Sequence, residues 1–261
     1  MINIFKLLKN KFVFRLIAVL ASAILLSSCA STPAGIDEVN DPFESFNRKT
    51  MQFNLAADKY VIRPFVVGYR KITPVFIQDG ISSMSHTWKQ PVTAVNAVLQ
   101  GDLNAFAQST GRFFTNLTLG IFGFFDVASK VDIEAPEKDF GQTLYTWGIK
   151  DAGPYIVLPI LGPSNVRDTT GRIADFFIDP VDWTLPKSED PLLLARYAIQ
   201  AVDTADASSD LLQDIQKTSI DPYTTMRSMY NQNRQKFLTD GDEIPTAPDY
   251  DFAFEDDEFE E

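Results

Sequence analysis

The sequence predicts a mainly α-helical protein, and three observations support this fold class. Asp-Pro pairs, which commonly open helices, occur at 41–42, 190–191 and 221–222. Apolar side chains recur at helical spacing through most of the chain. Alternation of apolar and polar residues with a period of two, which is typical of β-strands, is scarce. No Asn-Gly or Asp-Gly turn, of the kind that joins the strands of a β-hairpin, links two such runs.

The first expected helix begins at residues 41–44, Asp-Pro-Phe-Glu. Asp41 is expected to be the N-cap, Pro42 the first helical residue, and Glu44 the third. One aromatic stripe follows, made of Phe43, Phe46, Thr50 and Phe53.

Further helices are expected over 75–89, 92–108 and 164–177, the last with Ser164 as its N-cap. The residues after Pro191 and Pro222 also follow helical periodicity. The helices expected over 75–89, 92–108 and 164–177 each have an apolar face. In that order, the faces consist of Phe76, Ile77, Ile81, Met84 and Trp88; Val95, Val98, Leu99 and Phe106; and Val166, Ile173 and Phe177.

Two stretches differ from the pattern of a soluble helical bundle. Residues 112–130 are apolar nearly all round yet contain two glycines, and residues 144–163 mix large apolar residues with several glycines and prolines. The second stretch therefore cannot be one regular helix. Neither contains the uninterrupted apolar run of a transmembrane span. The first is either a buried core helix or part of a set of helices lying in a membrane plane.

Composition and charge exclude one class of function, the binding of nucleic acid. The chain has 21 Phe among 261 residues and a mean hydropathy of -0.07, so its aromatic surplus is balanced by many polar residues. Its formal net charge is -12. It has no basic stripe of the kind that binds nucleic acid, so nucleic acid is excluded as a partner.

The N-terminus reads as a lipoprotein signal peptide covering residues 1–28. A basic segment ends at Arg15, and the apolar run 16–26 is too short to span a bilayer as a helix. This run leads into Leu-Ser-Ser-Cys, which resembles a bacterial lipobox with Cys29 as the acylated residue. The alternative is an ordinary signal peptide with an incidental cysteine. Several acyl chains on Cys29 would make a durable membrane anchor. Ala30, by analogy with bacterial lipoproteins, favours the outer membrane.

The mature chain divides into three expected parts. Residues 29–40 form a lipidated tether, residues 41–239 a helical domain, and residues 240–261 an acidic tail. The tail holds 11 acidic residues and no basic residue, so we expect it to be disordered and exposed in the periplasm. Its three phenylalanines leave open that it docks to a periplasmic partner.

The residues needed for catalysis or metal binding are largely missing. One Cys and one His exclude a disulfide framework, a Cys/His zinc site and an iron–sulfur site. There is no nucleophile elbow, phosphate-binding loop or zinc-protease motif. His86 reads as a surface or helix-end histidine. We therefore expect no enzyme activity, no metal and no cofactor.

Many motifs together resemble the VacJ/MlaA phospholipid-transport lipoproteins of Gram-negative outer membranes. The resemblance covers roughly residues 41–238, and Ser45 stands where the family pattern has Gly. The matching residues are 41–48 without Ser45, Phe53-Asn54, Ile62-Arg63-Pro64, Arg112-Phe113-Phe114, Asn116, Leu119-Gly120, Gly123, Asp126-Val127-Ala128, Phe140-Gly141, Leu144, Gly148, Gly153-Pro154-Tyr155, Leu158-Pro159, Gly162, Arg167-Asp168 and Asp221-Pro222-Tyr223.

The resemblance implies a ring of amphipathic helices that lies in the inner leaflet of the outer membrane around a central channel. It further implies association with a porin trimer. Phospholipids would pass from the outer leaflet through the channel to a soluble periplasmic carrier of the Mla type. The alternatives are a structural porin-associated lipoprotein without transport, and a phospholipase or acyltransferase, which the absent nucleophile motif disfavours.

Two pairs of residues are candidates for roles in such a channel. Gly148 and Gly153 bracket the short segment 149–152, expected to be a hairpin loop near the pore with a hinge at each end. The alternative is a plain turn whose glycines satisfy a positive φ. Arg167 and Asp168 are either a membrane-proximal ion pair, a channel contact or a structural pair.

Overall fold

The computed structural model describes residues 40–184 and 191–239, and those from Asp41 onward belong to one compact unit. The predicted signal peptide, Cys29, the tether and the acidic tail from residue 240 lie outside the described residues. The described elements, in chain order, are α3 (Glu44–Ala57), the π-helix η2 (Asp58–Ile62), α4 (Arg63–Ile72), α5 (Val75–Gln100), α6 (Leu103–Thr118), the 3-10 helix η3 (Ala128–Val131), α7 (Phe140–Thr146), β1 (Tyr155–Leu158), β2 (Gly162–Asn165), α8 (Val166–Ile178), α9 (Pro180–Thr184), α10 (Pro191–Thr218) and α11 (Pro222–Leu238).

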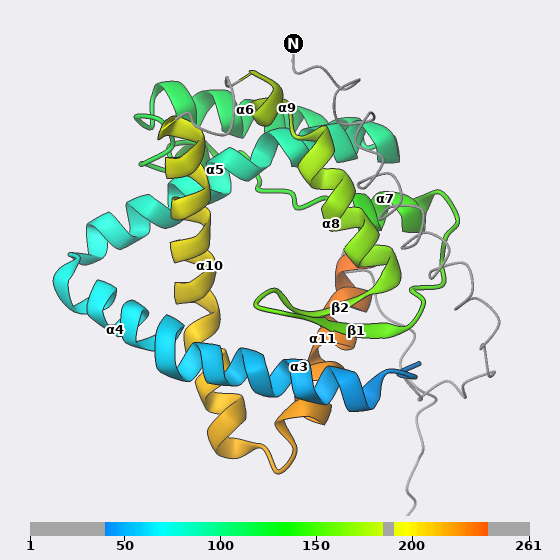
Figure 1. The fold of residues 1–261 in the computed structure, drawn as a ribbon. Coiled ribbons are helices and arrows are strands. Elements are labelled where there is room, and N and C mark those ends of the chain that lie inside the picture. The colour runs from blue at the N-terminus through cyan, green and yellow to red at the C-terminus, as the bar shows by residue number, and fades with distance from the viewer. Residues whose placement is uncertain (1–39, 185–190, 240–261) are drawn as a thin grey trace, which may run out of the picture. The chain divides into compact units, whose positions relative to one another are not determined.

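The helices of this unit are arranged as a ring, which confirms the predicted mainly α fold class (Figure 1). Helix α3, η2 and α4 form one side, α5 turns back from the end of α4, and α8 lies across from them. Helix α10 packs against α4 and α5, and the β1–β2 hairpin packs against α3 and α11. Segments far apart in the sequence therefore close the ring.

Helix α3 begins later than predicted, and Asp41 is not its N-cap. The N-cap position is Phe43, whose side chain makes no capping hydrogen bond. The Asp41 carboxylate instead accepts hydrogen bonds from the Tyr223 hydroxyl, from Arg227 at 2.8 Å and from Asn47 at 2.9 Å. A buried carboxylate is stabilised by a nearby cation, and Arg227 supplies one here.

Helix α5 continues through Pro91, so the predicted break between 75–89 and 92–108 is wrong. Proline removes one intrahelical hydrogen bond and displaces the backbone of the preceding turn. The carbonyl oxygen that loses its donor belongs to Thr87, four residues before Pro91. The next carbonyl oxygen, that of Trp88, accepts a hydrogen bond from Arg196 of α10, at 3.1 Å. The break lies instead at Gly101, which ends α5 with φ 77°. Asp102 then caps α6 by accepting from the Ala105 backbone nitrogen, at 2.8 Å.

The apolar stretch 112–130 is not a buried core helix. Helix α6 ends at Thr118, and a series of turns follows in which Ile121 and Phe122 have φ values of 53° and 56°. The large apolar side chains of this stretch that are exposed are Phe114, Leu119, Ile121, Phe122 and Phe125. The outward apolar face expected of a membrane-plane arrangement is therefore present.

The stretch 144–163 is irregular, as predicted, and contains the two-stranded sheet. Strands β1 and β2 pair antiparallel with Tyr155 opposite Asn165 and Leu158 opposite Gly162. The predicted N-cap of the following helix, Ser164, is one residue too early, because α8 begins at Val166. Asn165 caps α8 by accepting from the Asp168 backbone nitrogen, at 2.8 Å.

The two later Asp-Pro positions behave as the sequence predicts at their described residues. Helix α10 begins at Pro191. Asp221 is the N-cap of α11 and accepts from the Tyr223 backbone nitrogen at 3.1 Å.

A small core holds the hairpin between α3, α10 and α11. It consists of Met51, Tyr155, Val157, Ile215, Tyr223 and Met226. The rings of Tyr155 and Tyr223 meet edge to face, with centroids 6.1 Å apart. Within residues 40–184 and 191–239, no helix is both long and apolar enough to cross a membrane.

Candidate functional site

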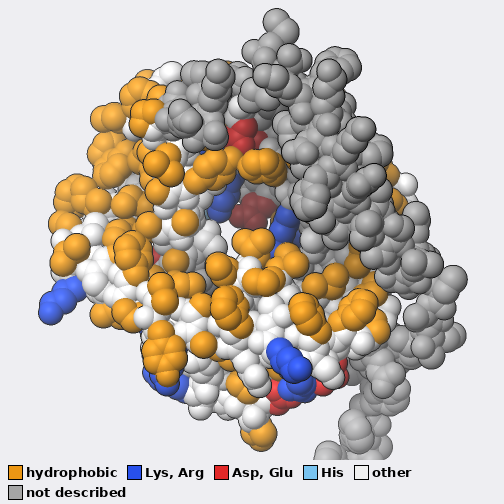
Figure 2. All heavy atoms as spheres, viewed as in Figure 1, with side chains coloured by type: hydrophobic (Ala, Val, Ile, Leu, Met, Phe, Trp, Pro, Cys, Tyr) orange, Lys and Arg blue, Asp and Glu red, His pale blue; other side chains and the backbone are white. Residues whose placement is uncertain are grey.

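The outer surface of the helical unit is unusually rich in phenylalanine. No phenylalanine among the described residues is buried. Figure 2 shows hydrophobic side chains gathered over α3, α4 and α5. We call the exposed set the phenylalanine-rich surface; it comprises Phe43, Phe46, Phe53, Phe65, Phe76, Phe106, Phe114, Phe122, Phe125, Phe176 and Phe177. Exposed apolar surface of this extent marks contact with a membrane or with another protein.

The interior shows the opposite composition. Side chains that are usually exposed are buried, among them Arg112, Arg167, Asp168 and Arg196, each at most 5% exposed. In Figure 2 a hollow opens between α5, α8 and α10, with acidic and basic side chains at its depth and hydrophobic ones around its mouth. The unit therefore has an apolar outer face, and it buries many polar and charged side chains beside its small apolar core.

Two polar pockets run along one face of α5. The first, of about 470 Å³, lies between α5, α8, α10 and α11, and the second, of about 420 Å³, lies between α5, α6 and the loop after it. Both pockets are lined by His86, Gln90 and Glu137. We call the two together the polar cleft.

A third, apolar pocket of about 410 Å³ lies between α5 and α6. It shares Gln90 with the polar cleft and begins at the next residue, Pro91. Its remaining lining is Ala94, Val95, Val98, Leu99, Phe106, Thr110, Phe113, Phe114 and Pro180. Helix α5 therefore separates a polar from an apolar compartment, and Gln90 lies at the boundary.

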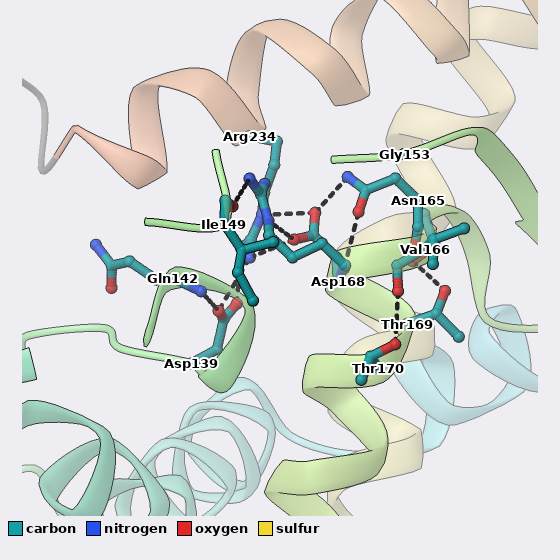
Figure 3. Close-up of polar contacts among 12 residues, drawn as sticks. Asp139, Gln142, Ile149, Gly153, Asn165, Val166, Asp168, Thr169, Thr170 and Arg234 are labelled. Carbon is teal, nitrogen blue, oxygen red and sulfur yellow. Dashed lines mark hydrogen bonds and ion pairs between the residues drawn. The ribbon is translucent and has the colours of Figure 1, made fainter. Parts of the chain in front are cut away.

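Arg234 of α11 joins two acidic side chains at one wall of the polar cleft (Figure 3). It donates to both oxygens of Asp139, at 2.6 and 2.9 Å, and to Oδ1 of Asp168 at 2.9 Å. Tyr230 adds a hydroxyl hydrogen bond to Oδ2 of Asp168, at 2.6 Å. One guanidinium thus connects the start of α7, the start of α8 and the end of α11.

This network keeps a buried carboxylate ionised. Burial acts to raise the pKa of Asp168, but the positive charge of Arg234 and the Tyr230 hydroxyl outweigh it and hold the pKa below its usual value. Burial also raises the pKa of the Tyr230 hydroxyl. Tyr230 therefore remains a hydrogen-bond donor to Asp168 at neutral pH.

Arg167 and Asp168 lie side by side, with Arg167 Nε 3.2 Å from Asp168 Oδ1, and both are buried. Arg167 Nη1 also donates to the carbonyl oxygen of Lys150, at 3.1 Å. The backbone nitrogen of Arg167 donates to the carbonyl oxygen of Ala152, at 3.1 Å. Arg167 thus fixes the segment 149–152 to the start of α8.

Segment 149–152 connects α7 to β1 and is not the turn of the hairpin, which lies between β1 and β2. The flanking glycines have positive φ values, 102° at Gly148 and 69° at Gly153. A Cβ atom at Gly148 would meet nothing within 4 Å, whereas one at Gly153 would lie 3.1 Å from Val166 Cβ. Their function as hinges stays a prediction.

Two further arginines anchor the walls of the cleft. Arg112 donates to Asp126 at 2.8 Å, and Arg196 donates to Asp182 at 2.7 Å and also binds Asp179. Burial acts to raise the pKa of Asp126, but hydrogen bonds that include one from Ser129 lower it to about 2. These arginines are engaged with carboxylates and serve to hold the elements together.

The polar cleft offers no assembled catalytic centre among its described residues. His86 is exposed, and no described Ser or acidic side chain hydrogen-bonds to its ring. In the part of the chain that the structure describes, no three His, Cys, Asp or Glu side chains are placed to hold a metal ion. The charged and amide side chains that line the cleft can bind polar and charged groups.

Several residues of this site carry no recognisable sequence motif. Lys89, Gln90 and Asp175 line the cleft, yet each resembles an ordinary polar residue on a helix. The sequence offered one signal for this site, the helical spacing of polar residues in α5. Asp79, Ser82, Ser83 and His86 recur at three- and four-residue intervals, which predicts a polar face on α5 opposite its apolar one.

Comparison with known proteins places the chain in a family. The sequence model of the MlaA lipoprotein family matches residues 39–237. An uncharacterized protein of Rickettsia typhi is 39% identical over 202 residues, which cover 77% of this chain and 79% of the relative. The intermembrane phospholipid transport system lipoproteins MlaA of Haemophilus influenzae and Escherichia coli are each 33% identical. Those two alignments cover 87% and 88% of this chain and 91% and 90% of the relatives.

The fold comparison agrees. A chain from a structure described as the structural basis for maintenance of bacterial outer membrane lipid asymmetry aligns with a TM-score of 0.65 and 30% sequence identity. The alignment covers 76% of this chain and 98% of that chain. Sequence and fold together show that this protein belongs to the MlaA lipoprotein family.

Proposed function

We propose that this protein is an outer-membrane lipoprotein that removes mislocalised phospholipids from the outer leaflet and passes them to a soluble periplasmic carrier. The observation that carries the proposal is the polarity of the helical unit, with phenylalanine outside and charged side chains inside. A phospholipid needs these two environments at once, because its tails favour hydrocarbon and its head group favours water. Two relatives that are named as intermembrane phospholipid transport lipoproteins support the same function.

The phenylalanine-rich surface favours a position within one leaflet. Burial of apolar surface is favourable by about 25 cal/mol per Å², so this surface is stabilised by contact with acyl chains. Anchoring at the predicted acylated Cys29 would put the helical unit in the inner, periplasmic leaflet of the outer membrane. The same apolar surface would also be available to a porin trimer, the expected partner in the membrane.

The polar cleft provides a route for the head group. A charged phosphate or amine that crosses hydrocarbon without partners is strongly disfavoured. Passage along a wall of polar side chains avoids that cost while the tails stay in contact with apolar surface. This step breaks no covalent bond, so the protein acts without enzyme activity.

Deletion of the gene tests the proposal. Phospholipid should rise in the outer leaflet, and cells should become sensitive to SDS with EDTA, because phospholipid patches weaken the lipopolysaccharide barrier. Re-expression of the intact chain should restore both properties. If the outer-leaflet composition of the deletion strain is unchanged, a structural porin-associated lipoprotein without transport is the better assignment.

A further inference from the structure

We propose that the polar cleft recognises phospholipids whose head group carries a primary ammonium, the class of phosphatidylethanolamine, in preference to choline or glycerol head groups. This inference rests on the proposed function and adds a substrate class to it. It comes from a buried amide oxygen that has no donor and from carboxylates of the cleft that have no salt-bridge partner among the described residues.

The first observation is a buried acceptor at the junction of the three pockets. Gln90 is 6% exposed, and its Oε1 has no hydrogen-bond partner among the described residues. Its Nε2 donates to the carbonyl oxygen of His86, at 3.5 Å. This contact fixes which end of the amide is the nitrogen, and Oε1 is the end that has no partner. A buried amide oxygen without a donor is costly, and a bound donor would relieve that cost.

The second observation is that several carboxylates of the cleft have no cation. Asp79, Glu137 and Asp175 line it, and none forms a salt bridge with a described residue. Asp175 accepts neutral hydrogen bonds only, from Asn96 at 2.7 Å and from the Phe140 backbone nitrogen at 3.2 Å. By contrast, the arginines of the cleft wall are already bound to carboxylates, as Arg234 is to Asp139. Oxygen acceptors and unbalanced negative charge together favour a ligand that brings a positive charge with N–H donors.

The third observation is a lysine on the wall of the same cleft. Lys89 is exposed in the same pocket and forms no salt bridge with a described residue. It follows His86 by three residues and therefore lies on the same face of α5. A zwitterionic head group matches this arrangement, with its phosphate toward Lys89 and its ammonium toward Glu137, Asp175 and Gln90.

The other common head groups fit less well. A choline nitrogen carries no N–H and cannot donate to Gln90 or to the carboxylates. A glycerol head group offers hydroxyl donors but leaves the lipid with a net negative charge that these carboxylates repel. The apolar pocket starting at Pro91 lies beside the boundary and can accept an acyl chain of the same lipid.

The test is a competition among head groups. The full-length lipidated protein is reconstituted with an equimolar mixture of phosphatidylethanolamine, phosphatidylcholine and phosphatidylglycerol that carry identical acyl chains, and the retained lipid is quantified by mass spectrometry. We expect about tenfold enrichment of the ethanolamine lipid over the choline lipid, because the latter loses every donor. Equal retention of the three lipids, or enrichment of another one, would overturn the inference.

Substitutions locate the preference. Glu137→Gln removes the negative charge of an exposed side chain, and it should reduce the enrichment severalfold. Asp175→Asn and Gln90→Leu should act in the same direction. The matched control is Glu134→Gln in the same loop, because Glu134 binds Gln108 at 2.7 Å and lines neither polar pocket. Unchanged enrichment in Glu137→Gln would count against the assignment.

The two proposals fail in different ways. Retention of phospholipid without head-group preference would contradict only the present inference. Retention of no phospholipid of any class by the intact protein would contradict lipid transport itself.

Discussion

Asn47 of α3 binds the backbone of the hairpin at Tyr155. Its Nδ2 donates to the carbonyl oxygen of Tyr155 at 2.9 Å, and its Oδ1 accepts from the backbone nitrogen of Val157, also at 2.9 Å. Asn54, two helical turns later, repeats this with the carbonyl oxygen of Leu158 and the nitrogen of Ile160. One face of α3 therefore satisfies the free edge of β1 in place of a third strand.

Asn47→Ala should destabilise the fold. It leaves a buried carbonyl oxygen and a buried N–H without partners, so we expect a loss of about 2–4 kcal/mol in the free energy of unfolding. The thermal midpoint of the protein in detergent measures this. The control is Asn104→Ala, an exposed asparagine near the start of α6, which should shift the midpoint little. Equal shifts in the two variants would show that the Asn47 contacts contribute nothing specific.

Gly171→Ala should be more damaging. A Cβ atom there would lie 2.4 Å from the backbone nitrogen of Gly141, so α7 and α8 would have to separate. We expect a loss of about 3 kcal/mol or more, seen as a lower thermal midpoint or low yield. Gly68→Ala is the control, since its Cβ would meet nothing within 4 Å and alanine favours the helix by up to about 1 kcal/mol. A neutral Gly171→Ala would mean that the two helices are not in close contact.

The ionisation of Asp175 should make stability depend on pH. Burial raises its pKa to about 6, above the unfolded value of 3.8, so the folded protein binds the proton more tightly. The stabilisation from this group is complete below about pH 4 and is lost as the pH rises through 6. The thermal midpoint of the wild type, relative to that of Asp175→Asn, should therefore fall between pH 4 and pH 7. A difference that does not vary with pH would contradict the raised pKa.

The hinge hypothesis for Gly148 and Gly153 can be tested without proline, which cannot adopt the positive φ values found here. Gly148→Ala introduces no clash but disfavours φ 102°, so it should weaken the described conformation of segment 149–152 by about 1–2 kcal/mol. If this segment moves during transport, the restoration of outer-leaflet composition in a deletion strain should change while the membrane level of the protein stays normal. A plain turn would show reduced stability with wild-type transport.

Arg167→Lys is the companion to that test. Lysine keeps the positive charge beside Asp168 but loses the planar group that contacts the Lys150 carbonyl. We expect faster hydrogen exchange in segment 149–152, with the rest of α8 still protected. Unchanged exchange in the segment would show that Arg167 does not hold it.

The anchor is tested at Cys29, which lies outside the described residues. Cys29→Ser should abolish acylation and lipoprotein-type cleavage, and the protein should lose stable outer-membrane association or function. Metabolic labelling with a fatty acid and membrane fractionation measure both effects. Normal acylation and localisation of this variant would exclude the predicted lipobox.

The sequence by itself determined the properties that depend on near neighbours. Helical spacing and the helix start at Asp221 were correctly predicted from it, because capping and periodicity involve residues within one or two helical turns. Its surplus of phenylalanine without high mean hydropathy predicted an outward apolar face, and that face is present. Local rules failed at Pro91, through which α5 continues, and at Asp41, whose carboxylate binds Tyr223 and Arg227 of α11 instead of capping α3.

Only the tertiary structure decided which polar side chains meet. Asp139, Asp168 and Arg234 lie on three separate elements, and nothing in their spacing shows that one guanidinium joins them. The same holds for Gln90, whose unpaired oxygen becomes visible only when α5, α6 and α8 are in place around it. Contacts of this kind depend on the closure of the ring by α10 and α11, because burial and hydrogen bonding are set by packing between distant segments and not by local sequence.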